Sequence, residues 1–123
     1  MKKEILYKEL GAGQGIAVSR EGPYEGKLSY PLVEVPSLKA SLSSRPGRPY
    51  PRCYLDVEAT LKVRDAIDDE RFLYDIAFHK AFDAMEEEDD EGEGLVFPKE
   101  GMTLEEIALS FIYSELPMKL TRK

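Results

Sequence analysis

The clearest pattern along the chain is a strict alternation of apolar and polar residues in its middle part. Every second position is apolar, and the positions between are polar, the apolar members being Leu55, Val57, Ala59, Leu61 and Val63. A period of two places successive side chains on opposite faces of an extended strand. Residues 54–64 are therefore predicted to form a strand with one buried and one hydrated face.

The pattern over residues 72–85 is open to two interpretations. Aromatic and branched side chains recur at every second position from Phe72 to Phe78, which predicts a strand paired with the preceding one across a polar turn at 65–70. A helix also fits, because a spacing of four residues links Tyr74, Phe78 and Phe82. The aromatic and β-branched content favours the strand.

The first half of the chain predicts short strands separated by turns. Residues 3–9 fit a short strand, and residues 37–43 alternate like a half-buried one. Residues 27–35 predict an edge or broken strand, because Pro31 lacks the N–H that a sheet ladder needs. A flexible turn is predicted where glycine alternates with other residues, at Gly11, Gly13 and Gly15.

The last element is predicted to be a helix. Thr103 can cap its N-terminus, and Glu106 three residues later completes a capping box. Pro117 prevents the helix from continuing. A core-facing stripe follows the cap at helical spacing, made of Leu104, Ile107, Ala108, Phe111 and Ile112. A short strand at residues 95–97 precedes the helix.

These elements predict an α+β fold in a single domain over residues 1–123. We expect an antiparallel, barrel-like sheet packed by one C-terminal helix. Residues 83–94 contain eight Asp and Glu side chains and no Lys or Arg, so we expect an acidic, mobile loop there.

Charge is unevenly distributed along the chain. The formal net charge is −7, yet residues 1–53 hold nine Lys and Arg against five Asp and Glu. The acidic balance therefore reports mainly the run at 83–93 and does not exclude an anionic partner. A single cysteine, no long apolar run and no secretory signal pattern predict a cytoplasmic protein.

The segment at residues 44–52 carries the most informative chemistry. Its prolines exclude helix and central strand, and Tyr50 lies among Arg45, Arg48 and Arg52. Guanidinium groups bind phosphates in a forked geometry, and a tyrosine ring offers a stacking surface for a base. One interpretation is an RNA-binding loop. The other is a surface loop whose arginines pair with the protein's own carboxylates.

Other candidate chemistry is sparse. His79 is the one histidine, and no nucleophile motif accompanies it. The acidic run lacks the ligand spacing of an EF-hand. We therefore predict no catalytic residue, no metal site and no cofactor.

Three segments in the second half, taken in order, resemble one known family. Arg52 and Cys53 open a strand similar to the family's Cys-x-Arg-Cys-Leu-Glu segment, and a strand pair is followed by an acidic run. The segment from Met102 to Lys119 is similar to the family's closing helix and its Leu-Pro-x-Lys ending. This is the YceD family of large-subunit ribosomal RNA accumulation proteins. The resemblance covers residues 50–120, and Tyr50 stands where the family has its first cysteine.

The resemblance implies a non-enzymatic factor that supports large-subunit ribosomal RNA accumulation or ribosome assembly through direct RNA contact. Its partners would be that RNA or an assembly factor, with no membrane involved. The family's functional positions fall on Arg52 and Cys53, and the loop composition adds Arg45, Arg48 and Tyr50. Two other hypotheses stay open: a protein–protein adaptor that docks through residues 83–93, and a small enzyme that uses His79.

Overall fold

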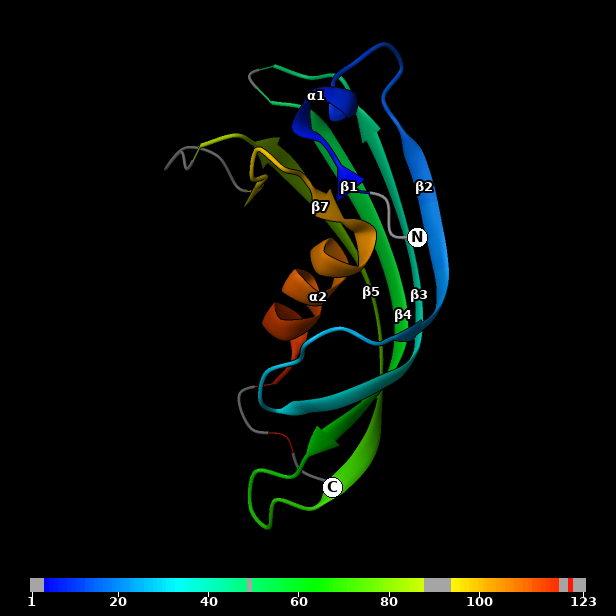
Figure 1. Ribbon diagram of the computed structural model, residues 1–123, viewed down its shortest axis with the longest axis vertical. Helices are drawn as coiled ribbons and strands as arrows, with labels where there is room; N and C mark the ends of the chain where they lie inside the picture. The colour runs from blue at the N-terminus through cyan, green and yellow to red at the C-terminus, as the bar shows by residue number, and fades with distance from the viewer. Residues whose placement is uncertain (1–3, 49, 88–93, 118–119, 121–123) are drawn as a thin grey trace.

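The fold is described from a computed structural model, which covers residues 4–48, 50–87, 94–117 and 120. Five strands form one long, bowed sheet in the order β2–β3–β4–β5–β6, and helix α2 lies against its inner side (Figure 1). The elements of this layer are β2 (Ala17–Tyr24), β3 (Leu32–Arg45), β4 (Arg52–Arg64), β5 (Arg71–Met85), β6 (Gly94–Val96) and α2 (Leu104–Glu115).

Neighbouring strands from β2 to β5 are antiparallel, and β6 joins β5 in parallel over three residues. A small second sheet pairs β1 (Glu4–Ile5) with β7 (Met102–Thr103), and helix α1 (Tyr7–Leu10) follows β1. The expected mostly antiparallel sheet with one C-terminal helix is confirmed. The expected barrel-like closure is not, because β2 and β6 end as opposite edges of an open sheet in the described part of the chain.

Strand β4 follows the alternation that the sequence predicts. Its odd positions are buried and its even positions face solvent or are half-buried, and it pairs with β5 without a register shift from Arg64 to Arg52. The alternative between strand and helix at residues 72–85 is settled for the strand, which spans all of β5. Pairing with β4 along the whole length stabilises the extended form over the helical spacing of the same side chains.

Strand β3 differs from its prediction. Two separate strands were expected, but the chain is continuous from Leu32 to Arg45 and pairs with both β2 and β4. Pro36 is accommodated because the register with β4 shifts between Leu32 and Glu34 and again between Glu34 and Ser37. Such an irregularity leaves a residue outside the ladder, which is where a strand tolerates proline.

The N-terminal prediction is only partly confirmed. Strand β1 covers Glu4–Ile5 alone, and the chain then turns into the short helix α1 instead of continuing as a strand. The glycine-rich turn follows, with Gly13 and Gly15 at positive φ. These conformations are available to glycine at low cost, so the alternating glycines do serve a turn between elements.

Helix α2 begins where the sequence predicts. The Thr103 hydroxyl accepts the backbone N–H of Glu106 at 3.2 Å and donates to the Glu106 carboxylate at 3.1 Å. The glutamate therefore contacts the hydroxyl instead of the backbone N–H of the capping residue. The helix ends at Glu115, before Pro117, and its apolar stripe packs on the inner face of the sheet, where Phe111 meets Phe82 at a ring separation of 4.9 Å.

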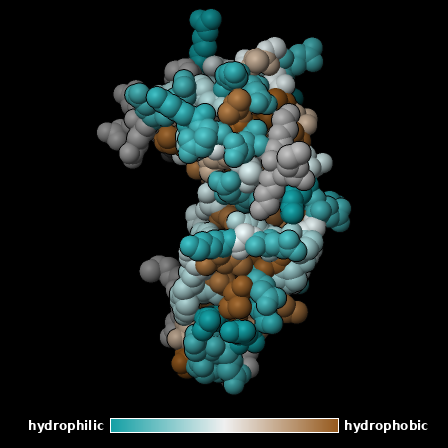
Figure 2. Space-filling model, in the orientation of Figure 1, coloured by the Kyte–Doolittle hydropathy of each residue, from teal (hydrophilic) through white to brown (hydrophobic). Residues whose placement is uncertain are grey.

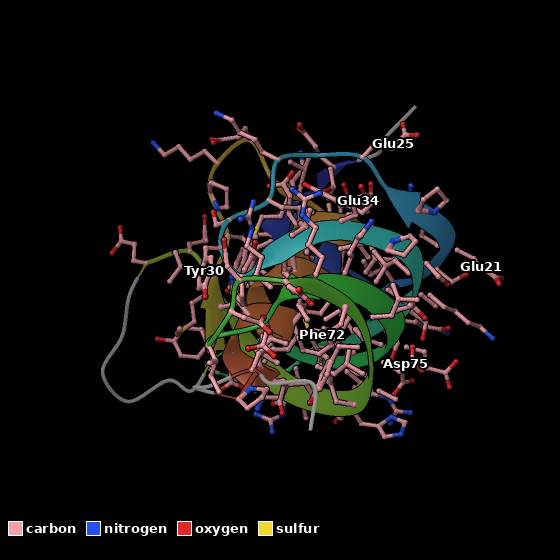
Figure 3. The ribbon with its side chains drawn as sticks, turned by 90° about the horizontal axis from the view of Figure 1, so that it is seen from below. Glu21, Glu25, Tyr30, Glu34, Phe72 and Asp75 are labelled. Atoms are coloured by element: carbon pink, nitrogen blue, oxygen red, sulfur yellow. The ribbon has the colours of Figure 1, made fainter. Side chains whose placement is uncertain are left out.

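The sheet has two faces of different character. Seen along the strands, it curls around α2, with Phe72 directed inward and Glu21 and Asp75 directed outward (Figure 3). The inner face holds the core, and the outer face is polar and open. Figure 2 shows apolar surface gathered in the lower half of the view, where the strands extend beyond α2.

Candidate nucleic-acid interface

The arginines predicted from the sequence gather at the hairpin that joins β3 to β4. Arg45 is the last residue of β3 and lies directly opposite Arg52, the first residue of β4. Both side chains are exposed, and Arg48 is exposed in the connection between them. The antiparallel register therefore brings three guanidinium groups to one end of the sheet.

This end of the sheet is held in place by the N-terminal segment. The buried Ser44 hydroxyl donates to the backbone oxygen of Leu10 at 2.8 Å and accepts the backbone N–H of Ile16 at 3.0 Å. Gly15 packs so closely that an added Cβ would lie 2.0 Å from the Ser44 backbone oxygen. Figure 1 shows α1 beside the β3–β4 connection at the upper end of the molecule. The hairpin base is thus anchored by contacts from a distant part of the chain.

The three arginines differ in how their charge is compensated. Arg52 forms an ion pair with Asp83 of β5, with an N–O separation of 2.9 Å and side chains 45% and 26% exposed. Arg45 and Arg48 have no carboxylate within ion-pair distance among the residues that the structure describes. Unpaired surface guanidinium groups remain available to an external anion.

The two tyrosines near the arginines are placed differently. Tyr50 is half-buried and already makes contacts within the protein. Tyr54 is 45% exposed and lies two positions beyond Arg52, so both face the outer side of the sheet. The ring offered to a ligand is therefore Tyr54. The sequence analysis missed it, although the alternation in β4 already assigned it to the hydrated face.

Cys53 belongs to the core. Its side chain has no exposed surface and packs within the main hydrophobic cluster. Burial raises the pKa of the thiol to about 12, Asp83 raises it further, and Arg52 acts in the opposite direction. A neutral, enclosed thiol offers no atom to an RNA and has low reactivity. Among the five predicted site residues, Arg45, Arg48 and Arg52 come together at the surface, while Tyr50 and Cys53 support the hairpin from within.

The acidic run begins beside this basic hairpin. Asp83 is still part of β5, and the exposed Glu86 and Glu87 follow the end of the strand. The expected mobile loop falls largely on residues 88–93, which lie outside the described residues.

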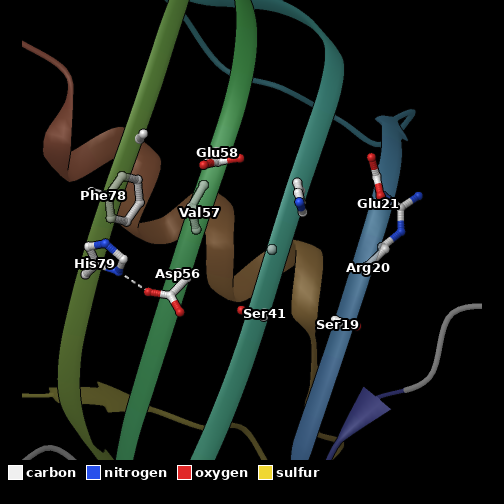
Figure 4. A pocket seen from close by; sticks show the side chains of 12 residues that line it. Ser19, Arg20, Glu21, Ser41, Asp56, Val57, Glu58, Phe78 and His79 are labelled. Carbon is white, nitrogen blue, oxygen red and sulfur yellow. Dashed lines mark hydrogen bonds and ion pairs between the residues drawn. The ribbon is translucent and has the colours of Figure 1, made fainter.

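A second polar surface lies on the outer face of the sheet. It is a shallow depression of about 470 Å³ that crosses four strands. Ser19, Ser41, Asp56 and His79 form one row across it, and Asp56 contacts the imidazole Nδ1 of His79 (Figure 4).

This row lacks the geometry of a nucleophilic site. The Ser41 hydroxyl and the imidazole are on opposite sides of Asp56, so the carboxylate separates the nucleophile from the base. The His79 and Asp56 side chains are 89% and 61% exposed, which leaves their charges screened by water. Glu21 and Glu58 flank Lys39 in the next row, so the face carries more acid than base and does not favour a polyanion.

The described residues contain no group of three or more His, Cys, Asp or Glu side chains arranged to hold a metal ion. Within the same ranges, no helix combines the length and the apolar character needed to cross a membrane. Comparisons with known protein families, with curated proteins and with solved structures find no match to this chain. The residues themselves are therefore the basis for the function proposed below.

Proposed function

We propose that this protein is a non-enzymatic factor that supports large-subunit ribosomal RNA accumulation or ribosome assembly. It contacts RNA through the β3–β4 hairpin, using Arg45, Arg48 and Arg52. The observation that carries the proposal is the convergence of these three arginines on one end of the sheet, beside the exposed ring of Tyr54. The resemblance to the YceD family in the second half of the chain supports the ribosomal assignment.

The arginine arrangement suits a phosphate backbone. A guanidinium group can donate two parallel hydrogen bonds to one phosphate, and Arg45 and Arg52 start from adjacent strands. Adjacent strands are about 5 Å apart, which lets both groups reach one phosphate or two successive ones. The Arg52–Asp83 ion pair is partly exposed, and such pairs contribute little, so a phosphate can replace the carboxylate at low cost.

The aromatic position favours unpaired RNA over duplex RNA. Bases in single-stranded loops can stack on tyrosine rings, whereas bases in a duplex are already stacked. Tyr54 lies on the same face as Arg45 and Arg52, so a nucleotide held by its phosphate can place its base on this ring. The substrate class is therefore a single-stranded segment or loop of ribosomal RNA.

Removal of the protein tests this function in the cell. Deletion should lower the level of large-subunit ribosomal RNA relative to small-subunit RNA and shift the sedimentation profile away from complete large subunits. A copy carrying Arg45→Ala, Arg48→Ala and Arg52→Ala should fail to restore both readouts. A control copy carrying Arg64→Ala and Arg71→Ala, at the opposite end of the sheet, should restore them. Normal RNA levels and profiles after deletion would rule the proposal out.

The acidic segment supports a second candidate function, that of a protein–protein adaptor. The exposed Glu86 and Glu87 continue from the end of β5 and open the acidic run. If this run is a docking segment, deletion of residues 86–93 should abolish capture of a basic partner protein and leave the fold intact. Unchanged capture would exclude this function.

A further inference from the structure

The two edges of the main sheet differ in how they are protected. Strand β2 forms one edge, and its register with β3 is disrupted between Gly22 and Tyr24, with Pro23 between them. Strand β5 forms most of the other edge, because β6 pairs only with Asp83 to Met85. From Arg71 to Phe82 the outer side of β5 has no strand partner among the described residues, and no proline or glycine interrupts it.

The backbone groups of β5 that point away from β4 can be assigned. Ala84 N–H donates to the Pro51 oxygen on the β4 side, whereas the Met85 oxygen accepts from Phe97 N–H on the β6 side. Directions alternate along a strand, and the β4–β5 register has no shift. The odd residues of β5 therefore direct their N–H and C=O groups to the free edge, where they are a template for another strand.

We propose that the free edge of β5 pairs with the same edge of a second copy of this chain, antiparallel and about a two-fold axis through Ala77. The two five-stranded sheets would then form one continuous sheet. A two-fold axis makes the contact self-complementary, so each pairing occurs twice.

Charge selects this register. Two copies of one strand must pair odd residues with odd, since only odd residues face the edge. An axis at Ala77 sets Asp75 opposite His79 of the other copy, and the reverse. An axis at Asp75 would place this carboxylate opposite itself, and an axis at His79 would place Asp75 opposite Asp83. Axes at Ile76 or Phe78 would leave Asp75 opposite alanine.

The inner face and the length of the free edge agree with the same register. An axis at Ala77 sets Ile76 opposite Phe78 and Phe72 opposite Phe82, all directed to the inner, apolar side of the sheet. The pairing then runs from Phe72 to Phe82 and stops where β6 begins opposite Asp83. Phe72, Ile76 and Phe78 are half-buried in one copy, so the pairing would cover apolar surface that α2 leaves open.

The first test compares two proline variants by sedimentation over a range of protein concentrations. Ala77→Pro removes one N–H from the free edge of β5 and leaves the bonds to β4 in place. Ser19→Pro is the matched control, because the β2–β3 bonds made at Ile16 and Ser44 place the Ser19 N–H on the opposite free edge. The wild-type protein and Ser19→Pro should sediment as dimers and Ala77→Pro as a monomer. A monomeric wild-type protein at all concentrations would overturn the proposal, as would a dimeric Ala77→Pro.

The second test checks the register and does not depend on the folding of a proline variant. Cα atoms opposite each other in a hydrogen-bonded pair are about 5.5 Å apart, which a disulfide can bridge. Ala77→Cys should therefore form a covalent dimer under mild oxidation. Ala81→Cys should not, because the residue opposite it is Leu73 of the other copy. Equal cross-linking of both variants, or of neither, would contradict the pairing.

A third test uses charge. Asp75→Lys replaces both attractive contacts with His79 by repulsive ones and should raise the dimer dissociation constant by about tenfold. Glu21→Lys is the matched control, since Glu21 is a carboxylate on the same outer face at the opposite edge. Equal weakening by both changes would place the contact elsewhere.

Discussion

The two long hairpins of the sheet begin from the same arrangement and arrive at opposite surfaces. At one end of β4, Arg52 lies opposite Arg45; at the other end, Arg64 lies opposite Arg71. Like charges in directly opposite positions repel each other, so each hairpin needs compensation or a ligand. The difference between them lies in the connecting residues.

The β4–β5 connection neutralises its own arginines. It contains Asp65, Asp68, Asp69 and Glu70, and Asp69 lies 3.0 Å from Arg64. The buried Asp65 carboxylate accepts the backbone N–H groups of Ile67 and Asp68, which closes the turn. The β3–β4 connection contains prolines, a glycine, a tyrosine and a third arginine, with no carboxylate. The comparison teaches that the connection, more than the strand ends, decides which hairpin is open to an anion.

The largest contrast concerns the residues beneath each arginine pair. Cys53 and Val63 occupy equivalent buried positions next to Arg52 and Arg64. Because burial raises the pKa of the Cys53 thiol from 9.0 to about 12, the thiolate at pH 8 should be about a thousand times scarcer than in the unfolded chain. Alkylation by iodoacetamide should therefore be slower by at least this factor in the native protein than in urea.

The same pKa shift predicts a pH dependence of stability. The folded state holds the thiol proton more tightly, so this stabilisation is complete below pH 9 and is lost as pH rises toward about 12. Cys53→Val, which copies the other hairpin, should lose less stability over that range than the wild-type protein. Urea unfolding at pH 8 and pH 10 measures the difference. Rapid alkylation of the native thiol would show that Cys53 is accessible after all.

A smaller effect is expected from the segment that anchors the basic hairpin. Gly15→Ala imposes a positive φ on alanine and pushes its Cβ against the Ser44 backbone, and should destabilise the protein by about 3 kcal/mol. Gly13→Ala has a similar φ but open space around it, and should cost about 1 kcal/mol. Urea denaturation of the two variants measures the contrast. Equal losses would mean that the close approach of Gly15 to Ser44 does not hold the hairpin base.

The acidic hairpin should depend on Asp65. Asp65→Ala leaves the backbone N–H groups of Ile67 and Asp68 without their acceptor and should cost about 2 kcal/mol of stability. RNA affinity should not change, because the site is at the other end of the sheet. Parallel measurements of unfolding and RNA binding test both statements, and a loss of RNA affinity at full folding would merge the roles of the two hairpins.

The smallest effect is expected from Asp69→Asn. The Arg64–Asp69 pair is exposed, so its loss should change stability by less than about 0.5 kcal/mol. Asparagine tolerates the positive φ at this position, so the turn should persist. Release of Arg64 should raise RNA affinity slightly, by about twofold or less. A large gain would show that Asp69 alone keeps the second hairpin from binding.

Local patterns in the sequence predict local structure well in this chain. The alternation in β4, the polar turn at 65–70 and the Thr103 cap each depend on neighbours within a few residues, and each is confirmed. Strand β3 was divided because the sequence shows Pro31 and Pro36 but not the register shifts that accommodate a proline. The N-terminal strand was predicted too long because its partner β7 offers only two residues.

Site residues were predictable by charge but not by accessibility. The clustering of three arginines is visible in the sequence. Their convergence on one face depends on the Arg45–Arg52 pairing, which is a property of the register. Burial of Cys53 and the half-burial of Tyr50 depend on contacts with distant segments. The Asp56–His79 contact likewise joins residues far apart in the sequence through strand pairing alone.

The central claim is that the β3–β4 hairpin is the RNA contact, and a salt series tests it most directly. Binding of a single-stranded large-subunit ribosomal RNA fragment is measured for three proteins: the wild type, the Arg45→Ala, Arg48→Ala, Arg52→Ala variant, and the Arg64→Ala, Arg71→Ala control. Each lost phosphate contact on a single strand lowers the slope of log affinity against log salt by about 0.7. The triple variant should therefore show a slope smaller by about 2 and a much weaker affinity at low salt, while the control keeps the wild-type slope. Absence of wild-type binding at low salt, or an unchanged slope in the triple variant, would contradict the account.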